Sequence, residues 1–145
     1  MPERALTAFK AYDLRGRLGH NIDEDVAYRF GRAAAEQHRA KSVAIGWDAR
    51  KTSEGLASAV ARGVTDAGAE AWNIGLAGTE EVYCATATLG ACLGVEVTAS
   101  HNPIDYNGMK IVAAGARPLD PGTEFMNLRR CAEVAAWRKT ACVGE

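Results

Sequence analysis

The reactive side chains of this sequence are concentrated in one segment, residues 98–110, between two stretches that read as strands. The segment, Thr-Ala-Ser-His-Asn-Pro-Ile-Asp-Tyr-Asn-Gly-Met-Lys, combines a hydroxyl, an imidazole, carboxamides, a carboxylate and an ammonium. Leu93–Val97 before it has the alternation and β-branched content of a strand, and Met109–Val112 reads as another. A polar loop at the end of a strand is where proteins often place chemistry.

Ser100 and His101 first suggest a hydrolase, because serine and histidine form the nucleophile and base of many such enzymes. Serine is a weak nucleophile unless a base activates it or a reactive group is already attached to it. Neighbouring residues of an extended chain point to opposite sides, so Ser100 and His101 are badly placed for a dyad. The segment also lacks the glycines of a nucleophile elbow. The sequence therefore disfavours a serine hydrolase.

A serine that carries a phosphoryl group needs different surroundings. Backbone N–H groups and cations must hold the dianion, a metal must offset charge during transfer, and one group must move a proton. The loop and Arg15 supply the first requirement. Lys110 fits the last one only if neighbouring positive charge or desolvation favours its neutral amine. Alternatively, Lys110 belongs to the polar face of a strand, and the Asn-Pro and Asn-Gly pairs are simple turn dipeptides.

Three motifs resemble one enzyme family. Ser-His-Asn-Pro at 100–103, preceded by Thr-Ala and followed by Asn-Gly-Met-Lys at 107–110, is similar to the phosphoserine loop of the α-D-phosphohexomutases, the phosphomannomutases and phosphoglucomutases. Phe-Lys-Ala-Tyr-Asp-Leu-Arg-Gly at 9–16 resembles their N-terminal signature. Gly-Thr-Glu-Glu-Val-Tyr at 78–83 is similar to a segment of bacterial phosphomannomutases. The resemblance covers about the first 120 residues.

The resemblance implies a role for each matching residue of the loop. Ser100 corresponds to the phosphoserine, which passes its phosphoryl group to a hexose monophosphate and recovers one from the bisphosphate intermediate. Phosphate thereby exchanges between C1 and C6 of the sugar. Lys110 matches the general acid/base, and His101 and Asn102 match residues that contact the phosphoserine region and orient substrate.

Two further pairs of residues join the candidate site through the resemblance. Tyr12 and Arg15 are expected to bind substrate and phosphate; taken alone they are a half-buried aromatic and a solvated turn residue. Gly-Trp-Asp-Ala-Arg at 46–50, followed by Ser53, matches the family's Gly-x-Asp-x-Arg pattern. Asp48 and Arg50 either support the phosphate or tie a loop together, and the sequence leaves both interpretations open.

The resemblance also implies groups that this chain does not supply. The family's Mg²⁺ is held by the phosphoserine, here Ser100, and by three aspartates of an Asp-Gly-Asp-x-Asp-Arg loop in a third domain; no such sequence occurs here. Mg²⁺ requires about six ligands, of which Ser100 supplies one. We therefore expect residues 1–145 to form a single domain, domain I of four, with domains II–IV absent, and to be inactive without them.

The expected partners are a hexose phosphate, a hexose 1,6-bisphosphate activator and the missing domains. Selection between mannose and glucose would lie in those domains. The alternative is a stand-alone, non-catalytic module that binds phosphate or phosphosugar, or is vestigial. Exposed interdomain surfaces would also favour self-association.

The elements that position these residues alternate between strand and helix. Strands are predicted over 8–14, 42–46, 69–74, 93–97 and 109–112, and helices over 23–39, 53–67, 79–89 and from about 121 onward. This alternation predicts an α/β fold, a three-layer αβα domain with a mixed, mostly parallel sheet. Ligands of such sheets bind outside the carboxyl ends of strands, where Ser100, Arg15 and Asp48 are expected to meet.

Composition excludes several other classes of protein. With 145 residues, 48% hydrophobic and 24% charged, the chain is typical of a soluble globular domain. A net charge of −1 predicts neither nucleic-acid nor membrane binding, and no apolar run is long enough to span a bilayer. With no signal peptide at 1–4, we expect a cytoplasmic protein whose four cysteines are reduced.

Overall fold

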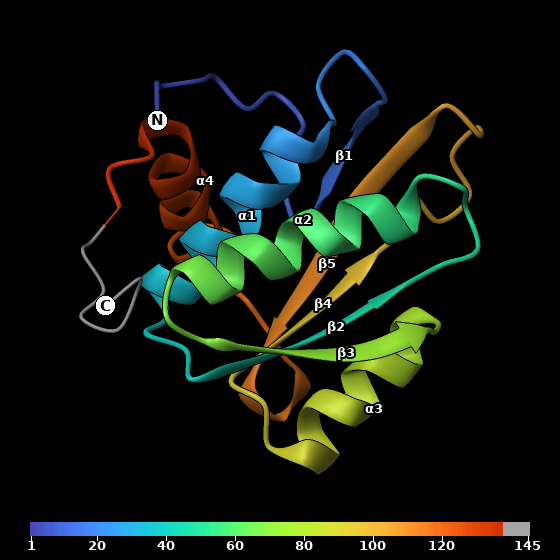
Figure 1. Ribbon diagram of the computed structural model, residues 1–145, viewed down its shortest axis with the longest axis vertical. Coiled ribbons are helices and arrows are strands. Elements are labelled where there is room, and N and C mark those ends of the chain that lie inside the picture. The colour runs from blue at the N-terminus through green and yellow to red at the C-terminus, as the bar shows by residue number, and fades with distance from the viewer. Residues whose placement is uncertain (138–145) are drawn as a thin grey trace.

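A computed structural model describes residues 1–137 as a mixed β-sheet between two layers of helices (Figure 1). The strands are β1 Leu14–Arg17, β2 Ser42–Trp47, β3 Glu70–Leu76, β4 Leu93–Val97, β5 Tyr106–Ala113 and β6 Arg117–Pro118. The helices are α1 Glu24–Gln37, α2 Ser53–Asp66, α3 Thr79–Leu89 and α4 Glu124–Val134, with a short 3₁₀ turn at Ala114–Ala116.

The order of strands in the sheet is β1-β5-β4-β2-β3, with β6 paired to β5. β2 pairs in parallel with β3 and β4, whereas β5 runs antiparallel to β4, β1 and β6. The predicted three-layer α/β fold with a mixed sheet is confirmed, although its antiparallel part is larger than expected. The reason is local: β5 returns directly through residues 98–105 without a crossover helix, and a short connection can only make an antiparallel pair.

Helices α1, α2 and α4 cover one face of the sheet, and α3 covers the other (Figure 1). Two glycines let α1 and α2 approach each other closely. A Cβ at Gly31 would lie 2.2 Å from the carbonyl oxygen of Val60, and one at Gly63 would lie 2.3 Å from that of Tyr28. The close helix pair forms a firm layer behind the central strands, whose carboxyl ends carry the candidate site.

The first strand was predicted in the wrong place. β1 begins at Leu14, where the predicted strand ends, and residues 8–13 form a loop. In this loop the Lys10 N–H donates to the Asp13 carbonyl at 2.8 Å. Ala8 and Phe9 are nevertheless buried. Their apolar character reflects core packing from a loop, a pattern that local periodicity does not separate from a strand.

Two other boundaries also differ from the predictions. β5 begins at Tyr106 rather than Met109, because Tyr106 pairs with Arg17 of β1. α4 begins at Glu124 rather than near residue 121, after the N-cap residue Thr123. The remaining predicted helices and strands agree with the structure to within two residues at each end.

Two sequence expectations concern the chain as a whole. Of the cysteines expected to be reduced, Cys84 and Cys92 are free thiols, whereas Cys142 lies outside the described residues. Within residues 1–137, no helix combines the length and the apolar character required to cross a membrane.

Candidate functional site

Ser100 lies exposed in a tight turn just beyond β4. Its φ is +55°, in the left-handed region that residues with a Cβ rarely occupy. The Ser100 N–H donates to Thr98 Oγ1 at 3.0 Å, and Asn102 donates twice to the Ala99 carbonyl, from its N–H at 3.1 Å and its side-chain amide at 2.7 Å. The turn therefore holds Ser100 in a strained backbone conformation, which is common at functional sites.

Arg50 holds the backbone of this loop in place through hydrogen bonds. Its guanidinium donates to four backbone carbonyls of the loop, those of Ser100 (3.0 Å), Asn102 (2.6 Å), Pro103 (2.7 Å) and Tyr106 (3.3 Å). Only 16% of the Arg50 side chain is exposed. Hydrogen bonds from a charged donor are stronger than neutral ones, so one side chain fixes the path of the whole turn. The structure thus shows the loop-tying arrangement for Arg50, and a phosphate contact by this residue stays a prediction.

Asp48 connects the ends of β2 and β4 to the start of α2. Its N–H donates to the Val97 carbonyl at 3.0 Å, and its Oδ2 accepts the Thr98 hydroxyl at 2.8 Å. Oδ1 accepts the Arg50 N–H at 3.0 Å and the Ser53 hydroxyl. Asp48 therefore organises the loop through protein donors, and substrate binding by Asp48 stays a prediction as well.

Asn107 is a supporting residue that the sequence reasoning missed. It is fully buried, and its Nδ2 donates to the hydroxyls of Thr52 at 2.9 Å and Ser53 at 3.0 Å. Its Oδ1 accepts the Gly108 N–H at 2.9 Å. The alternative interpretation of the Asn-Gly pair was a turn dipeptide, whereas both residues lie within β5 and Asn107 joins that strand to α2.

Arg15 and Lys110 lie on neighbouring strands at the same end of the sheet. Arg15 on β1 stands opposite Gly108 of β5, whose carbonyl accepts the Thr98 N–H at 2.9 Å. A Cβ at Gly108 would lie 1.9 Å from the Leu14 carbonyl oxygen, so only glycine allows this approach of β1. The topology thus brings Arg15, as predicted, and also Lys110 to the end of the sheet where the Ser100 loop begins.

Asp13 bridges these two cations and was not among the predicted site residues. Its Oδ1 lies 3.3 Å from Arg15 Nε, and its Oδ2 lies 3.4 Å from Lys110 Nζ. The sequence signal that could have identified Asp13 is its position two residues before Arg15, within the N-terminal signature. Sequence reasoning placed positive charge beside Lys110, whereas the structure also places a carboxylate in contact with it.

Glu96 is a second missed acid, behind the loop in β4. The residue is 1% exposed, and neither of its carboxyl oxygens has a hydrogen-bond partner among the described residues. Burial raises the pKa of Glu96 to about 8, with smaller contributions from the negative charges of Asp48 and Glu81. Near neutral pH this side chain is therefore mainly an uncharged acid. Gly46 leaves room for it, since a Cβ there would lie 3.1 Å from Glu96 Oε1.

The remaining predicted residues lie at the surface. Tyr12 is 74% exposed and precedes Asp13, and His101 is exposed beside Ser100. Asn102 is partly buried, with its side-chain amide engaged in the turn. These positions leave Tyr12 and His101 open to a ligand, whereas Asn102 has a structural role in the turn. Contacts of Tyr12, His101 and Asn102 with substrate stay predictions.

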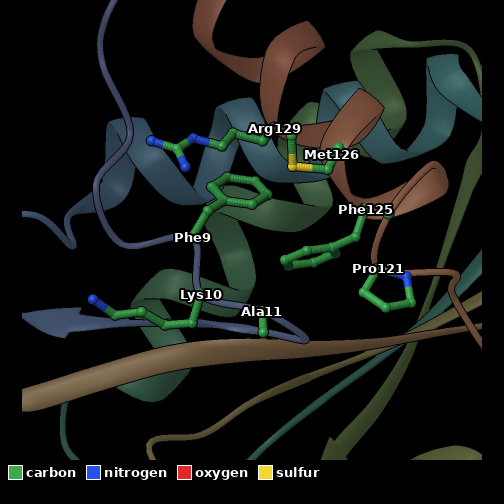
Figure 2. A pocket seen from close by; sticks show the side chains of 8 residues that line it. Phe9, Lys10, Ala11, Pro121, Phe125, Met126 and Arg129 are labelled. Atoms are coloured by element: carbon green, nitrogen blue, oxygen red, sulfur yellow. The ribbon is translucent and has the colours of Figure 1, made fainter.

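An apolar hollow of about 340 Å³ lies elsewhere, between the N-terminal segment and α4 (Figure 2). The rings of Phe9 and Phe125 line it with their centroids 5.1 Å apart, and Met126 and Arg129 border it from α4. None of the predicted site residues lines this hollow. The Ser100 loop, with its charged and strained groups, remains the better candidate for chemistry.

The family of the chain follows from comparison with known proteins. Residues 6–128 match the family described as phosphoglucomutase/phosphomannomutase, alpha/beta/alpha domain I. The chain belongs to this family. The resemblance inferred from the motifs is therefore confirmed.

The relatives of this phosphoglucomutase/phosphomannomutase domain include both long and short proteins. A phosphomannomutase of Salmonella typhimurium is 55% identical over 128 residues, which are 88% of this chain but 28% of the relative. A phosphomannomutase of Klebsiella pneumoniae is 52% identical over 128 residues, which are 82% of that relative. The chain therefore spans less than a third of the long relatives and most of the short one.

Solved structures agree with this assignment. A phosphoglucomutase/phosphomannomutase family protein from Burkholderia thailandensis superposes with a TM-score of 0.82 at 32% identity, over 96% of this chain and 32% of that one. A protein from Thermus thermophilus shares the fold with a TM-score of 0.79 at 23% identity. The αβα arrangement of Figure 1 is thus the fold of this family's domain I.

Proposed function

We propose that this domain carries the phosphoserine of a phosphohexose mutase and that Ser100 is the phosphorylated residue. The reaction is the interconversion of hexose 1-phosphate and hexose 6-phosphate, of mannose or glucose, through a bisphosphate. The observation that carries the proposal is the turn at Ser100. Ser100 is an exposed serine with a positive φ, and the Arg50 guanidinium donates to the backbone carbonyls of Ser100 and Asn102. Such a rigid turn suits a group that must receive and return a phosphoryl group at one fixed place.

Each neighbouring side chain has a role in this reaction. As the sugar hydroxyl oxygen bonds to phosphorus, the bond from phosphorus to Ser100 Oγ breaks and the hydroxyl proton passes to Lys110. Arg15, which is 43% exposed, offers its charge to the phosphoryl oxygens. His101 and Tyr12 are exposed and available to orient the sugar. The reverse sequence returns the phosphoryl group to Ser100, and the sugar has then exchanged its phosphorylated position.

Residues 1–137 do not provide a complete Mg²⁺ site. Phosphorylated Ser100 would provide one oxygen ligand, but residues 1–137 contain no group of three or more His, Cys, Asp or Glu side chains arranged to hold a metal. No step above therefore passes through the metal. We propose that the other ligands and the sugar-recognition groups come from further domains, since the long relatives extend well beyond the matched region.

The test is intact mass measurement with peptide mapping of Ser100, before and after incubation with glucose 1,6-bisphosphate and Mg²⁺. We expect one phosphate-sized increment, located on Ser100 and lost in Ser100→Ala. Thr98→Val is a matched control, because it removes a neighbouring hydroxyl but leaves Ser100 in place. An unmodified Ser100 in a folded sample would contradict the carrier role and favour a domain that binds phosphate or phosphosugar without turnover.

A further inference from the structure

Asp13, Arg15 and Lys110 form one cluster of charged side chains. Both cations contact the Asp13 carboxylate. Arg15 Nε lies 3.3 Å from Oδ1, and Lys110 Nζ lies 3.4 Å from Oδ2. Asp13 is the least exposed of the three, at 14% against 43% for Arg15 and 29% for Lys110. A carboxylate with both oxygens engaged in a partly buried place fixes its partners better than a solvated pair does.

The register of the sheet explains why these three side chains meet. Leu14 pairs with Met109 in the antiparallel β1–β5 ladder, so the next position outward sets Asp13 opposite Lys110. Asp13 and Arg15 are two residues apart and lie on one face of the chain, where side chains alternate. The Lys10 N–H bond to the Asp13 carbonyl fixes the turn that brings Asp13 to this point. Backbone geometry therefore positions the carboxylate before any ligand arrives.

The other titratable groups on this face do not replace Asp13. Glu96 stands opposite Lys110 in the β4–β5 ladder, yet its carboxyl is buried and has no hydrogen-bond partner among the described residues. Burial raises the pKa of Tyr83, which lies on α3. The negative charges of Asp13 and Glu96 raise this pKa further. Asp13 is thus the only carboxylate that the described residues place in an ion pair with Lys110.

We propose that Asp13 is a positioning residue that holds Arg15 and Lys110 together beside the Ser100 loop. The inference rests on the proposed function of Ser100. Without Asp13, two like charges on adjacent strands repel each other and separate. A phosphoryl group that binds the more exposed Arg15 competes with Asp13 for that guanidinium.

The test measures the reactivity of the Lys110 amine by competitive acetylation and peptide mapping at one pH, with exposed Lys10 as the internal reference. The ion pair holds the Lys110 amine against the Asp13 carboxylate and hinders its attack on the reagent, so we expect Asp13→Asn to increase acetylation of Lys110 relative to Lys10 by roughly three- to tenfold. Asp105→Asn removes the same charge from a pair with Arg17 on the same strand and is expected to leave Lys110 unchanged. Asp13→Glu, which keeps the carboxylate, should stay near wild type.

A second measurement needs no variant and covers the case in which Asp13→Asn does not fold. In the wild-type chain, an increase in salt from about 0.05 M to about 1 M screens the ion pair. Acetylation of Lys110 relative to Lys10 should then rise. A ratio independent of salt in the wild type, or a ratio in folded Asp13→Asn equal to that in Asp105→Asn, would overturn the proposal.

Phosphorylation of Ser100 is followed in the same samples and separates the two proposals. If wild type becomes phosphorylated, we expect slower phosphorylation in Asp13→Asn and recovery in Asp13→Glu. Faster acetylation of Lys110 in Asp13→Asn with no phosphorylation of wild type would support the ion-pair arrangement and contradict the carrier function. Normal phosphorylation together with unchanged acetylation in Asp13→Asn would contradict the role of Asp13 and leave the carrier function standing.

Discussion

Replacement of Glu96 by glutamine should remove most of the pH dependence of stability between pH 4.5 and 8. Burial raises the pKa of Glu96 from its ordinary 4.5 to about 8, so the folded protein binds this proton more tightly than the unfolded chain does. The contribution of Glu96 is therefore most favourable below pH 4.5 and is lost as pH rises to about 8. At about 1.4 kcal/mol per pH unit, the loss approaches 5 kcal/mol.

Glutamine is a suitable replacement because it has nearly the shape of the neutral acid and does not titrate. The glutamine amide, like the acid it replaces, has no hydrogen-bond partner at this site. Wild type and Glu96→Gln should therefore have similar free energies of unfolding near pH 5. Above pH 8 the Glu96→Gln chain should be more stable by several kcal/mol, because wild type must then bury a charge or open the site. A difference of that size is a large part of the total stability of a domain.

Urea unfolding at pH 5, 6, 7 and 8 measures this difference directly. Glu80→Gln is the matched control, since Glu80 is an exposed acid in the first turn of α3 and its loss should leave the pH dependence of wild type intact. If the unfolding free energies of wild type and Glu96→Gln remain parallel from pH 5 to 8, Glu96 is already ionised in the folded protein. The reasoning from its burial would then be wrong.

Three further changes test the support of the Ser100 loop and the helix layer. Arg50→Ala leaves four loop carbonyls without their donor and should abolish phosphorylation of Ser100 and lower stability by roughly 2–4 kcal/mol, as measured by peptide mapping and urea unfolding. Asn107→Ala removes a buried amide with three hydrogen bonds and should cost about 2–3 kcal/mol; a change below about 0.5 kcal/mol would contradict its supporting role. Gly31→Ala places a Cβ against the carbonyl of Val60 and should cost more than about 2 kcal/mol, whereas Gly55→Ala, with its nearest atom at 3.6 Å, should be neutral or stabilise α2 by up to about 1 kcal/mol. Finally, the exposed apolar side chains predict self-association at high concentration, and a monomer in sedimentation velocity would contradict it.

Much of the molecule was predictable because its signals are local. Each of these signals lies within one continuous segment of the chain. They are the apolar stripes of α1 and α2, the buried runs of β2 and β4, and the polar loop at Ser100. The motif around Ser100 also fixed the family, since its residue types and order are unusual. Hydrophobic periodicity and chain order were thus sufficient for the α/β architecture and for the edge of the sheet at which the site lies.

The tertiary structure alone decided which side chains support the site. Arg50 binds carbonyls about fifty residues away in the chain, and the contact of Asp13 with Lys110 depends on the register of two strands far apart in sequence. In the sequence Glu96 resembles an ordinary strand residue, and only the folded structure shows that it is buried. The physical reason is common to all three: ion pairing, hydrogen bonding and desolvation depend on distances in space. A local sequence pattern does not contain those distances.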